Sequence, residues 1–251
     1  MKKLLYSLLA ISTLSITACE KNAVTLISDA NSSVAFIYAA PGAPTTDIVI
    51  DGLVSNGSRR LSYGLTSLSG GGGNGGAYIP LVNGSKSIKI STDSGRTSLI
   101  DTRYQFDANK SYTIAVYDTL LASGTPALRS VQLTDDLTVP SGTNVHVRFL
   151  HLAPLAPAVD LTLLRTSPSV DSVTLTNRTY LGATPNAAAL SAFAPIPGGT
   201  AYTLRVKLAG TQTVVASISL GTNLSSGRIV TLSAVGTAKG APLGVLSLRH
   251  Y

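Results

Sequence analysis

The sequence predicts an all-β protein made of two tandem antiparallel Ig-like β-sandwiches, preceded by a signal peptide and a short tether. Three observations predict it. Charged residues make up only 12% of the 251 residues and tryptophan is absent, a composition that disfavours coiled coils and long helices. Short runs rich in Val, Ile, Thr and Tyr alternate with turn residues along the chain. A short proline-containing signature also occurs twice, which indicates internal repetition.

The amino terminus is predicted to be a leader that ends at an acylation site. Residues 1–3 carry two lysines, and residues 4–16 form an apolar run shorter than the roughly 18 residues that cross a bilayer. The sequence Ile16-Thr17-Ala18-Cys19 resembles a bacterial lipobox, in which a small residue precedes the cysteine that becomes lipidated. We therefore expect residues 1–18 to be a lipoprotein signal peptide, Cys19 to be the lipidation site and residues 19–33 to form the tether.

Cys19 is the only cysteine in the chain, which excludes an intrachain disulfide and a cysteine-based metal cluster. Each buried methylene of an acyl chain contributes about 0.8 kcal/mol, so several chains would anchor the protein without a transmembrane helix. We expect a lipid-anchored protein of the cell outer membrane, because Glu20 is not the aspartate that resembles an inner-membrane retention signal. The sequence leaves the surface and periplasmic faces both open.

The basic charge of the chain does not predict nucleic-acid binding. The formal net charge of +7 includes two lysines of the leader. The remaining Lys and Arg residues are scattered singly, apart from Arg59 and Arg60, without a basic stripe interleaved with aromatic residues. The expected partners are the membrane, through the lipid anchor, and a possible glycan or envelope protein.

The repeated signature is predicted to be a loop between two strands. It reads Ala-Pro-x-Ala-Pro-x-x-Asp-aliphatic, from residue 40 and again from residue 153. Its prolines cannot donate ladder hydrogen bonds, and its aspartates, Asp47 and Asp160, are expected to accept backbone amide bonds that hold the turn. Matches continue at slightly larger offsets, so we expect domains at residues 34–138 and 139–251.

Strand-like periodicity covers both halves, and no run has a convincing helical period. In the first half we expect strands at residues 34–39, 47–51, 87–91, 98–104, 112–118 and 128–133. In the second half we expect them at residues 145–150, 159–164, 171–176, 202–208, 213–220, 229–235 and 244–248.

The second copy of the signature and the strand before it resemble the DUF4397 domain. The resemblance rests on Val145, Val147, Arg148, Phe149, His151, Ala153, Pro154, Ala156, Pro157 and Asp160. It implies a bacterial extracytoplasmic β-domain, often in tandem and often on lipoproteins, with no established activity. The first copy has Ala35 in place of Arg148 and Tyr38 in place of His151, so we do not expect it to perform a role that needs both. The candidate residues for a binding or structural loop are Pro41, Pro44, Asp47, Arg148, His151, Pro154, Pro157 and Asp160.

The residues predict neither catalysis, nor a cofactor, nor a metal site. A retaining glycosidase needs two carboxyl groups about 5 Å apart, whereas Asp47 and Asp160 occupy equivalent places in separate domains. His146 and His151 lie an odd number of positions apart and should face opposite sides of a sheet. Ten tyrosines offer either a platform for stacking sugars or ordinary buried strand residues.

We expect a non-catalytic binding, adhesion or envelope-scaffold module with an unidentified ligand. The alternatives are a glycan-directed hydrolase and an accessory subunit of an envelope complex.

Overall fold

The computed structural model is almost entirely β over the residues that it describes, and its named helical elements are the 3₁₀ turn η1 (Asp93–Gly95) and the short helix α1 (Ala187–Ser191). The all-β sandwich prediction is therefore confirmed. No helix among the residues described is long and apolar enough to cross a membrane. The predicted signal peptide, Cys19 and most of the predicted tether lie outside the described residues. The structure describes residues 31–57, 59–66, 78–119, 128–167, 170–199, 201–221, 224–237 and 241–250.

Within the described ranges, each half of the chain contributes eight strands. We call residues 31–138 the first unit and residues 139–250 the second unit. The strands of the first unit are β1 (Asn31–Tyr38), β2 (Asp47–Ile50), β3 (Leu53–Val54), β4 (Ile79–Val82), β5 (Gly84–Thr92), β6 (Thr97–Phe106), β7 (Ser111–Tyr117) and β8 (Arg129–Asp135). Those of the second unit are β9 (Asn144–His151), β10 (Val159–Ser167), β11 (Asp171–Arg178), β12 (Ala194–Pro197), β13 (Ala201–Leu208), β14 (Val214–Gly221), β15 (Ile229–Val235) and β16 (Gly244–Arg249).

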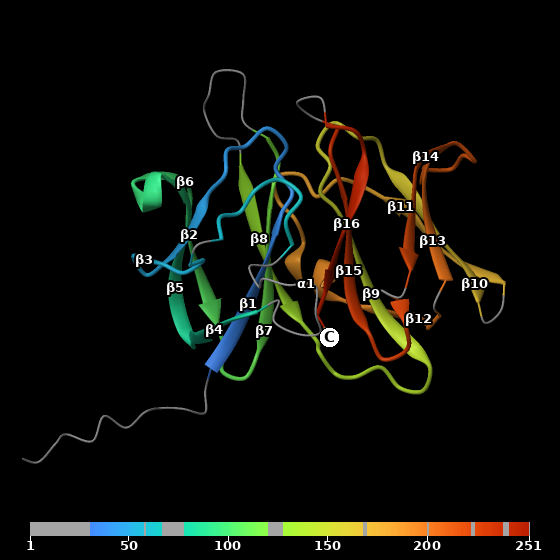
Figure 1. Cartoon of the computed structure of the whole chain (residues 1–251), viewed down its shortest axis with the longest axis horizontal. Helices are drawn as coiled ribbons and strands as arrows, with labels where there is room; N and C mark the ends of the chain where they lie inside the picture. Colours follow the sequence, from blue (N-terminus) through green and yellow to red (C-terminus); the bar gives the residue numbers. More distant parts are fainter. Residues whose placement is uncertain are drawn as a thin grey trace, which may run out of the picture.

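The same strand order occurs twice. In the first unit, the order β4-β1-β7-β8 forms an inner sheet and the order β3-β2-β5-β6 forms an outer sheet. In the second unit, the orders β12-β9-β15-β16 and β11-β10-β13-β14 repeat these arrangements with every strand number raised by eight. Figure 1 shows the four sheets from left to right as outer, inner, inner and outer.

The expectation of purely antiparallel sheets is wrong at one strand pair in each unit. β1 pairs with β7 in parallel, and β9 pairs with β15 in parallel. The reason is the path of the chain, which returns from the outer sheet at the end of the sandwich where β1 begins. The backbone N–H of Ser33 accordingly donates to the carbonyl of Lys110, just before β7, at 3.1 Å.

The sequence pattern missed three edge strands, β3, β4 and β12. β4 contains Pro80 and β12 contains Pro195 and Pro197, and prolines mask a strand pattern although they are tolerated on sheet edges. The pairing of β1 with β4 also shows that the folded part begins before residue 34, the predicted start of the first domain. β1 begins at Asn31 rather than at residue 34, because Ser32 is buried and pairs with Leu81 on β4.

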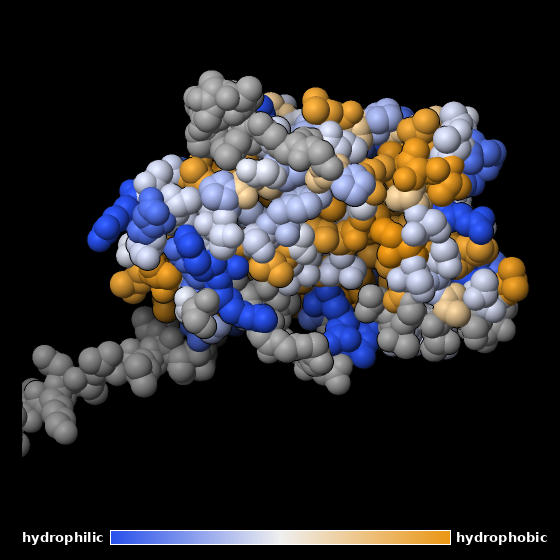
Figure 2. All heavy atoms as spheres, turned by 45° about the horizontal axis from the view of Figure 1, so that its top comes forward, coloured by the Kyte–Doolittle hydropathy of each residue, from blue (hydrophilic) through white to orange (hydrophobic). Residues whose placement is uncertain are grey.

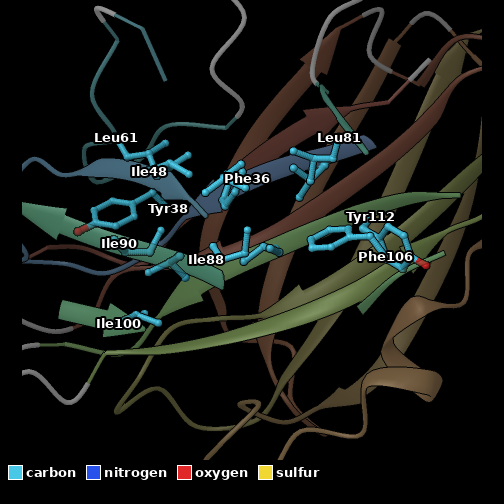
Figure 3. Packing of buried hydrophobic residues seen from close by; sticks show 14 of the residues in the cluster. Phe36, Tyr38, Ile48, Leu61, Leu81, Ile88, Ile90, Ile100, Phe106 and Tyr112 are labelled. Carbon is cyan, nitrogen blue, oxygen red and sulfur yellow. The ribbon is translucent and has the colours of Figure 1, made fainter. Parts of the chain in front are cut away.

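Each unit has an apolar core between its own two sheets. In the first unit, alternate residues of β1 point into this core, where Phe36 and Tyr38 pack against Ile48 and Ile90 from the outer sheet (Figure 3). In the second unit, Val147 and Phe149 of β9 occupy the corresponding place. These cores follow from the two-residue period of a strand.

A third cluster joins the two inner sheets to each other. The intervening residues of β1, such as Ile37, pack with Leu150 and Leu152 of the second unit. The strands β1, β7, β9 and β15 are consequently buried on both faces, which explains why their sequences are nearly unbroken apolar runs. The two units thus form a continuous four-layer stack.

The connections between strands three and four of each unit also cross to the other unit. Thr66 Oγ1 donates to the Ser247 carbonyl on β16 at 3.2 Å. Reciprocally, the backbone N–H of Thr134 on β8 donates to Ser191 Oγ of α1 at 3.0 Å. On the face shown in Figure 2, apolar side chains gather mainly over the second unit.

Candidate functional site

The four signature prolines lie in two loops at the same end of the molecule. We call residues 39–46, which join β1 to β2, the first Ala-Pro loop, and residues 152–158, which join β9 to β10, the second Ala-Pro loop. Both loops are at the top of Figure 1, whereas β1 begins at the bottom. The loops therefore face away from the point where the described chain starts.

Tyr38 and His151 perform the same task in their respective loops. Tyr38 Oη donates to the Pro44 carbonyl at 3.1 Å. His151 Nε2 lies 3.1 Å from the Pro157 carbonyl, and because a carbonyl only accepts, this nitrogen carries the proton. Burial lowers the pKa of His151, which favours the neutral ring. The tyrosine thus supplies in the first unit the bond that the histidine supplies in the second.

A threonine holds the other proline carbonyl of each loop. Thr119 Oγ1, just after β7, donates to Pro41 at 3.0 Å. Thr237 Oγ1, just after β15, donates to Pro154 in the same way. Each Ala-Pro loop is therefore tied to its inner sheet at both proline carbonyls. Neither threonine was among the candidate residues that the sequence predicted for the Ala-Pro loops.

Leu155 gives the second Ala-Pro loop an exposed apolar tip. Its side chain is 82% exposed, and its φ of 65° lies in the left-handed region. The first loop has Gly42 in that conformation, with φ of 74°. Glycine adopts this region freely, whereas a leucine there is strained.

Asp47 and Asp160 occupy the same register but have different bonds. Asp47 pairs with Ser91, and Asp160 pairs with Lys207. Asp47 is buried, and its Oδ1 accepts from Asn56 Nδ2 at 3.2 Å and from Arg60 Nε at 3.1 Å.

The carboxylate of Asp160 links β10 to two neighbouring segments. Asp160 is partly exposed and accepts backbone N–H groups from Asn177 at 2.7 Å and Gly210 at 2.9 Å. These bonds lower the pKa of Asp160, which keeps it ionised. The two signature aspartates therefore lie in separate outer sheets, and the carboxylate of each accepts hydrogen bonds from neighbouring segments of its own unit.

Arg148 is not at the Ala-Pro loops but at the contact between the two inner sheets. It is 1% exposed, and its Nη1 forms an ion pair with Asp135 Oδ1 of the first unit at 2.8 Å. Its Nε donates to Thr231 at 3.0 Å and its Nη2 donates to Thr113 at 3.1 Å. The guanidinium carbon also lies 4.5 Å from the ring centroid of Phe193. A single arginine thus contacts both units.

Tyr78 and His250 complete this buried cluster, and the geometry assigns their protons. Tyr78 has one hydroxyl proton, which it donates to Asp135 Oδ2 at 2.7 Å. The same oxygen lies 2.5 Å from His250 Nδ1, so that nitrogen must be the donor. Burial lowers the pKa of His250 to about 4, so the ring is neutral at pH 7 and its Nε2 accepts from the Thr231 hydroxyl at 2.7 Å. Arg148 and Asp135 are then the two charges of the cluster.

The pKa directions agree with this assignment. Burial lowers the pKa of His250 to about 4, an effect that Asp135 opposes and Arg148 reinforces. Burial, assisted by Asp135, raises the pKa of Tyr78. A second cation beside Arg148 is thus disfavoured at neutral pH.

The cluster is built from equivalent positions of the two units. Thr113 and Thr231 are the third residues of β7 and β15. Tyr78 and Phe193 directly precede β4 and β12. The two inner sheets accordingly meet like the two halves of a self-complementary interface.

Asp135 and His250 are also equivalent. Asp135 pairs with the first residue of β7, and the N–H of His250 donates to the carbonyl of Ile229, the first residue of β15, at 2.8 Å. Arg148 has Ala35 as its counterpart, since each precedes by three residues the side chain that bonds its Ala-Pro loop. Arg148 is the only cluster member among the predicted candidates.

An open groove of about 570 Å³ lies beside the cluster, between the start of β7, the end of β8 and α1. Its polar lining includes Lys110, Thr134, Asp136 and Ser191. Bonds from the side chain and the backbone N–H of Thr138 lower the pKa of Asp136. The described residues contain no group of three or more His, Cys, Asp and Glu side chains placed to hold a metal ion.

The tyrosines do not form a sugar-stacking platform in the described part of the chain. None of its eight tyrosines is exposed, and Tyr38, Tyr112, Tyr117 and Tyr202 are buried. The alternative, strand residues whose rings are buried, describes Tyr38, Tyr112, Tyr117 and Tyr202.

Comparison with known proteins identifies one family. No curated protein matches the chain. The model of the domain of unknown function DUF4397 matches residues 32–162, which include the first unit from its second residue onward, both Ala-Pro loops, Arg148 and His151. Because this match spans more than half of the chain, the protein belongs to the DUF4397 family.

Proposed function

We propose that this protein is a lipoprotein of the outer membrane, anchored at Cys19, whose two units act as a non-catalytic binding module. The observation that carries the proposal is the sequence Ile16-Thr17-Ala18-Cys19 after a basic start and an apolar run, in a chain with no other cysteine. A thioether-linked lipid with further acyl chains anchors a protein stably, because each methylene adds to the membrane affinity.

The direction of the strands supports a role in presenting the Ala-Pro loops. β1 begins at Asn31 and ends at Tyr38, directly before the first Ala-Pro loop. Eight residues of strand span about 26 Å, and β9 runs the same way in the second unit (Figure 1). An anchor that precedes β1 would therefore leave both Ala-Pro loops at the end far from the membrane.

We also propose that the second unit is a second copy of the family's domain. Its strand order repeats that of the first unit, and its Ala-Pro loop is held by bonds at equivalent positions. The repeated signature in the sequence points the same way.

The bonds of the signature aspartates support a binding role over the hydrolase alternative. Asp47 and Asp160 lie in different outer sheets and hold neighbouring segments in place. A pair of carboxyl groups facing a common substrate, as glycoside hydrolysis requires, would need a different arrangement.

Two measurements test the anchor. Cells expressing the protein are labelled with radioactive palmitate, and membranes are separated from soluble fractions, for the wild type and for Cys19→Ala. We expect label and membrane association in the wild type and loss of both in the variant. A Cys19→Ala protein that still partitions with the membrane would overturn the proposal.

Single added cysteines then report the exposed face of the membrane. Leu155→Cys and Val82→Cys place a thiol at side chains that are 82% and 61% exposed at opposite ends of the molecule, and Ala35→Cys is a matched buried control. A membrane-impermeant maleimide that labels the first two variants on intact cells indicates the cell surface. Labelling only after permeabilisation indicates the periplasm.

A further inference from the structure

The outward face of the outer sheet β11-β10-β13-β14 carries hydroxyl groups around Arg205, which has no ion pair with any residue that the structure describes. Leu204 and Val206 of β13 point into the second core, so Arg205 between them points outward. In register with Arg205 lie Thr162 on β10 and Ser217 on β14. Thr174 on β11 extends this row, and its hydroxyl lies 3.2 Å from that of Thr162. The row of side chains that contains Arg205 is therefore polar.

On the equivalent face of the first unit, the corresponding cation is paired with a carboxylate. There Lys89 occupies the place of Arg205 and forms an ion pair with Asp101 on β6 at 3.0 Å. Asp101 faces Lys89 across the strands, as Ser217 faces Arg205. The second unit thus lacks the carboxylate that neutralises this position in the first unit.

The second unit as a whole has few carboxylates. Residues 31–138 hold eight Asp and eight Lys or Arg, whereas residues 139–251 hold two Asp and eight Lys or Arg. Of these two aspartates, Asp171 is paired with Arg165, and Asp160 is held by backbone N–H groups. Arg205 forms none of the ion pairs among the described residues, so its charge is available to a ligand.

We propose that this face binds an acidic polysaccharide, with Arg205 holding a carboxylate or sulfate group and the flanking hydroxyls bonding to sugar hydroxyls. A guanidinium presents a planar fork that fits such oxyanions. Four strands about 4.8 Å apart give a flat surface about 14 Å wide, enough for several sugar units. The described part of the face has no aromatic side chain of the kind that protein interfaces concentrate at their centres.

This inference deepens the proposed binding role and rests on it, but its test does not depend on the lipid anchor. The full-length chain, solubilised in non-ionic detergent, is titrated with alginate and with chondroitin sulfate, and with dextran as the neutral probe. Arg205→Ser removes the outward cation. Lys89→Ser removes one cation from the equivalent strand position of the first unit and serves as the matched control.

We expect binding to one or both acidic probes and none to dextran. Arg205→Ser should weaken this binding about tenfold, while Lys89→Ser should change it less than about twofold, as suits a local charge-assisted contact. No binding to either acidic probe, or equal loss in both variants, would overturn the inference. Tighter binding to single-stranded DNA or to phosphatidylglycerol vesicles would do the same and assign the face to another polyanion. Neither result would bear on the palmitate experiment.

Discussion

Acid is expected to destabilise the contact between the two units through His250. This side chain is surrounded by Tyr78, Thr231, Arg148 and Asp135, and the edge of its ring meets Phe193. In the neutral ring, Nε2 accepts from the Thr231 hydroxyl. A proton on that nitrogen would force the hydroxyl proton of Thr231 to turn away and would place a second positive charge near Arg148, with a single carboxylate to balance both.

The size and sign of the effect follow from the pKa difference between the folded and unfolded states. Burial lowers the pKa of His250 to about 4 in the folded protein, whereas a solvated histidine titrates at about 6.5. Between pH 6.5 and pH 4, the histidine therefore binds a proton in the unfolded chain but not in the folded chain. The free energy of unfolding falls over this range and levels off below pH 4. The difference corresponds to a loss on the order of 3 kcal/mol.

The assay is urea unfolding of the Cys19→Ala chain, followed by tyrosine fluorescence because tryptophan is absent. Free energies of unfolding are measured at several pH values from 7 to 4 and compared with those of His250→Gln on the same background. Burial also lowers the pKa of His151, so this comparison isolates the share of His250. The wild-type side chain should lose on the order of 3 kcal/mol more than the glutamine over this range. Parallel pH profiles would refute the assigned protonation state.

Three further substitutions test the packing, each by urea unfolding. Arg148→Met leaves Asp135 buried without its cation and should lower the free energy of unfolding by about 3 to 5 kcal/mol. A decrease below about 1 kcal/mol would contradict the buried ion pair. Gly236→Ala puts a Cβ 2.0 Å from a backbone carbonyl at φ of 104° and should cost more than about 2 kcal/mol. Gly210→Ala is the control, because its added Cβ would have nothing within 4 Å; it should lower the free energy of unfolding by about 1 kcal/mol. Similar decreases for the two variants would argue against the close approach of Gly236 to the Pro242 carbonyl. Thr119→Val should cost about 1 kcal/mol and speed hydrogen exchange in the first Ala-Pro loop alone; unchanged exchange there would argue against the threonine tie.

Local pattern was sufficient to predict the Ala-Pro loops and every named strand except the edge strands β3, β4 and β12. The two-residue period identifies the strands that line a core, such as β5 with Ile88 and Ile90. Pro41, Pro44, Pro154 and Pro157 mark the Ala-Pro loops because they cannot join a ladder. The same rule hid β4 and β12, whose prolines occupy sheet edges.

The sequence contains a pattern that indicates the contact between the two units, but this contact was not predicted from it. The runs at residues 34–40 and 229–235 are buried on both faces, and their lack of polar alternation is typical of strands between two layers. Arg148 in such a strand is ambiguous, because an arginine can point to solvent or pair in the interior. Its partners come from β7, β8 and β15, and local sequence does not specify how two sheets are superposed.

The divergence of equivalent positions explains why this interface contains one ion pair. If both units had aspartate at the position of Asp135 and alanine at that of Arg148, two buried carboxylates would lack a cation. If both units had histidine at the position of Asp135 and arginine at the position of Arg148, two buried arginines would lack a counter-ion. Either arrangement carries a desolvation cost of several kcal/mol per uncompensated charge. With Asp135 and Ala35 on one side and His250 and Arg148 on the other, the cluster holds one charge of each sign. An interface between identical copies cannot make this division, whereas two units with different side chains in one chain can.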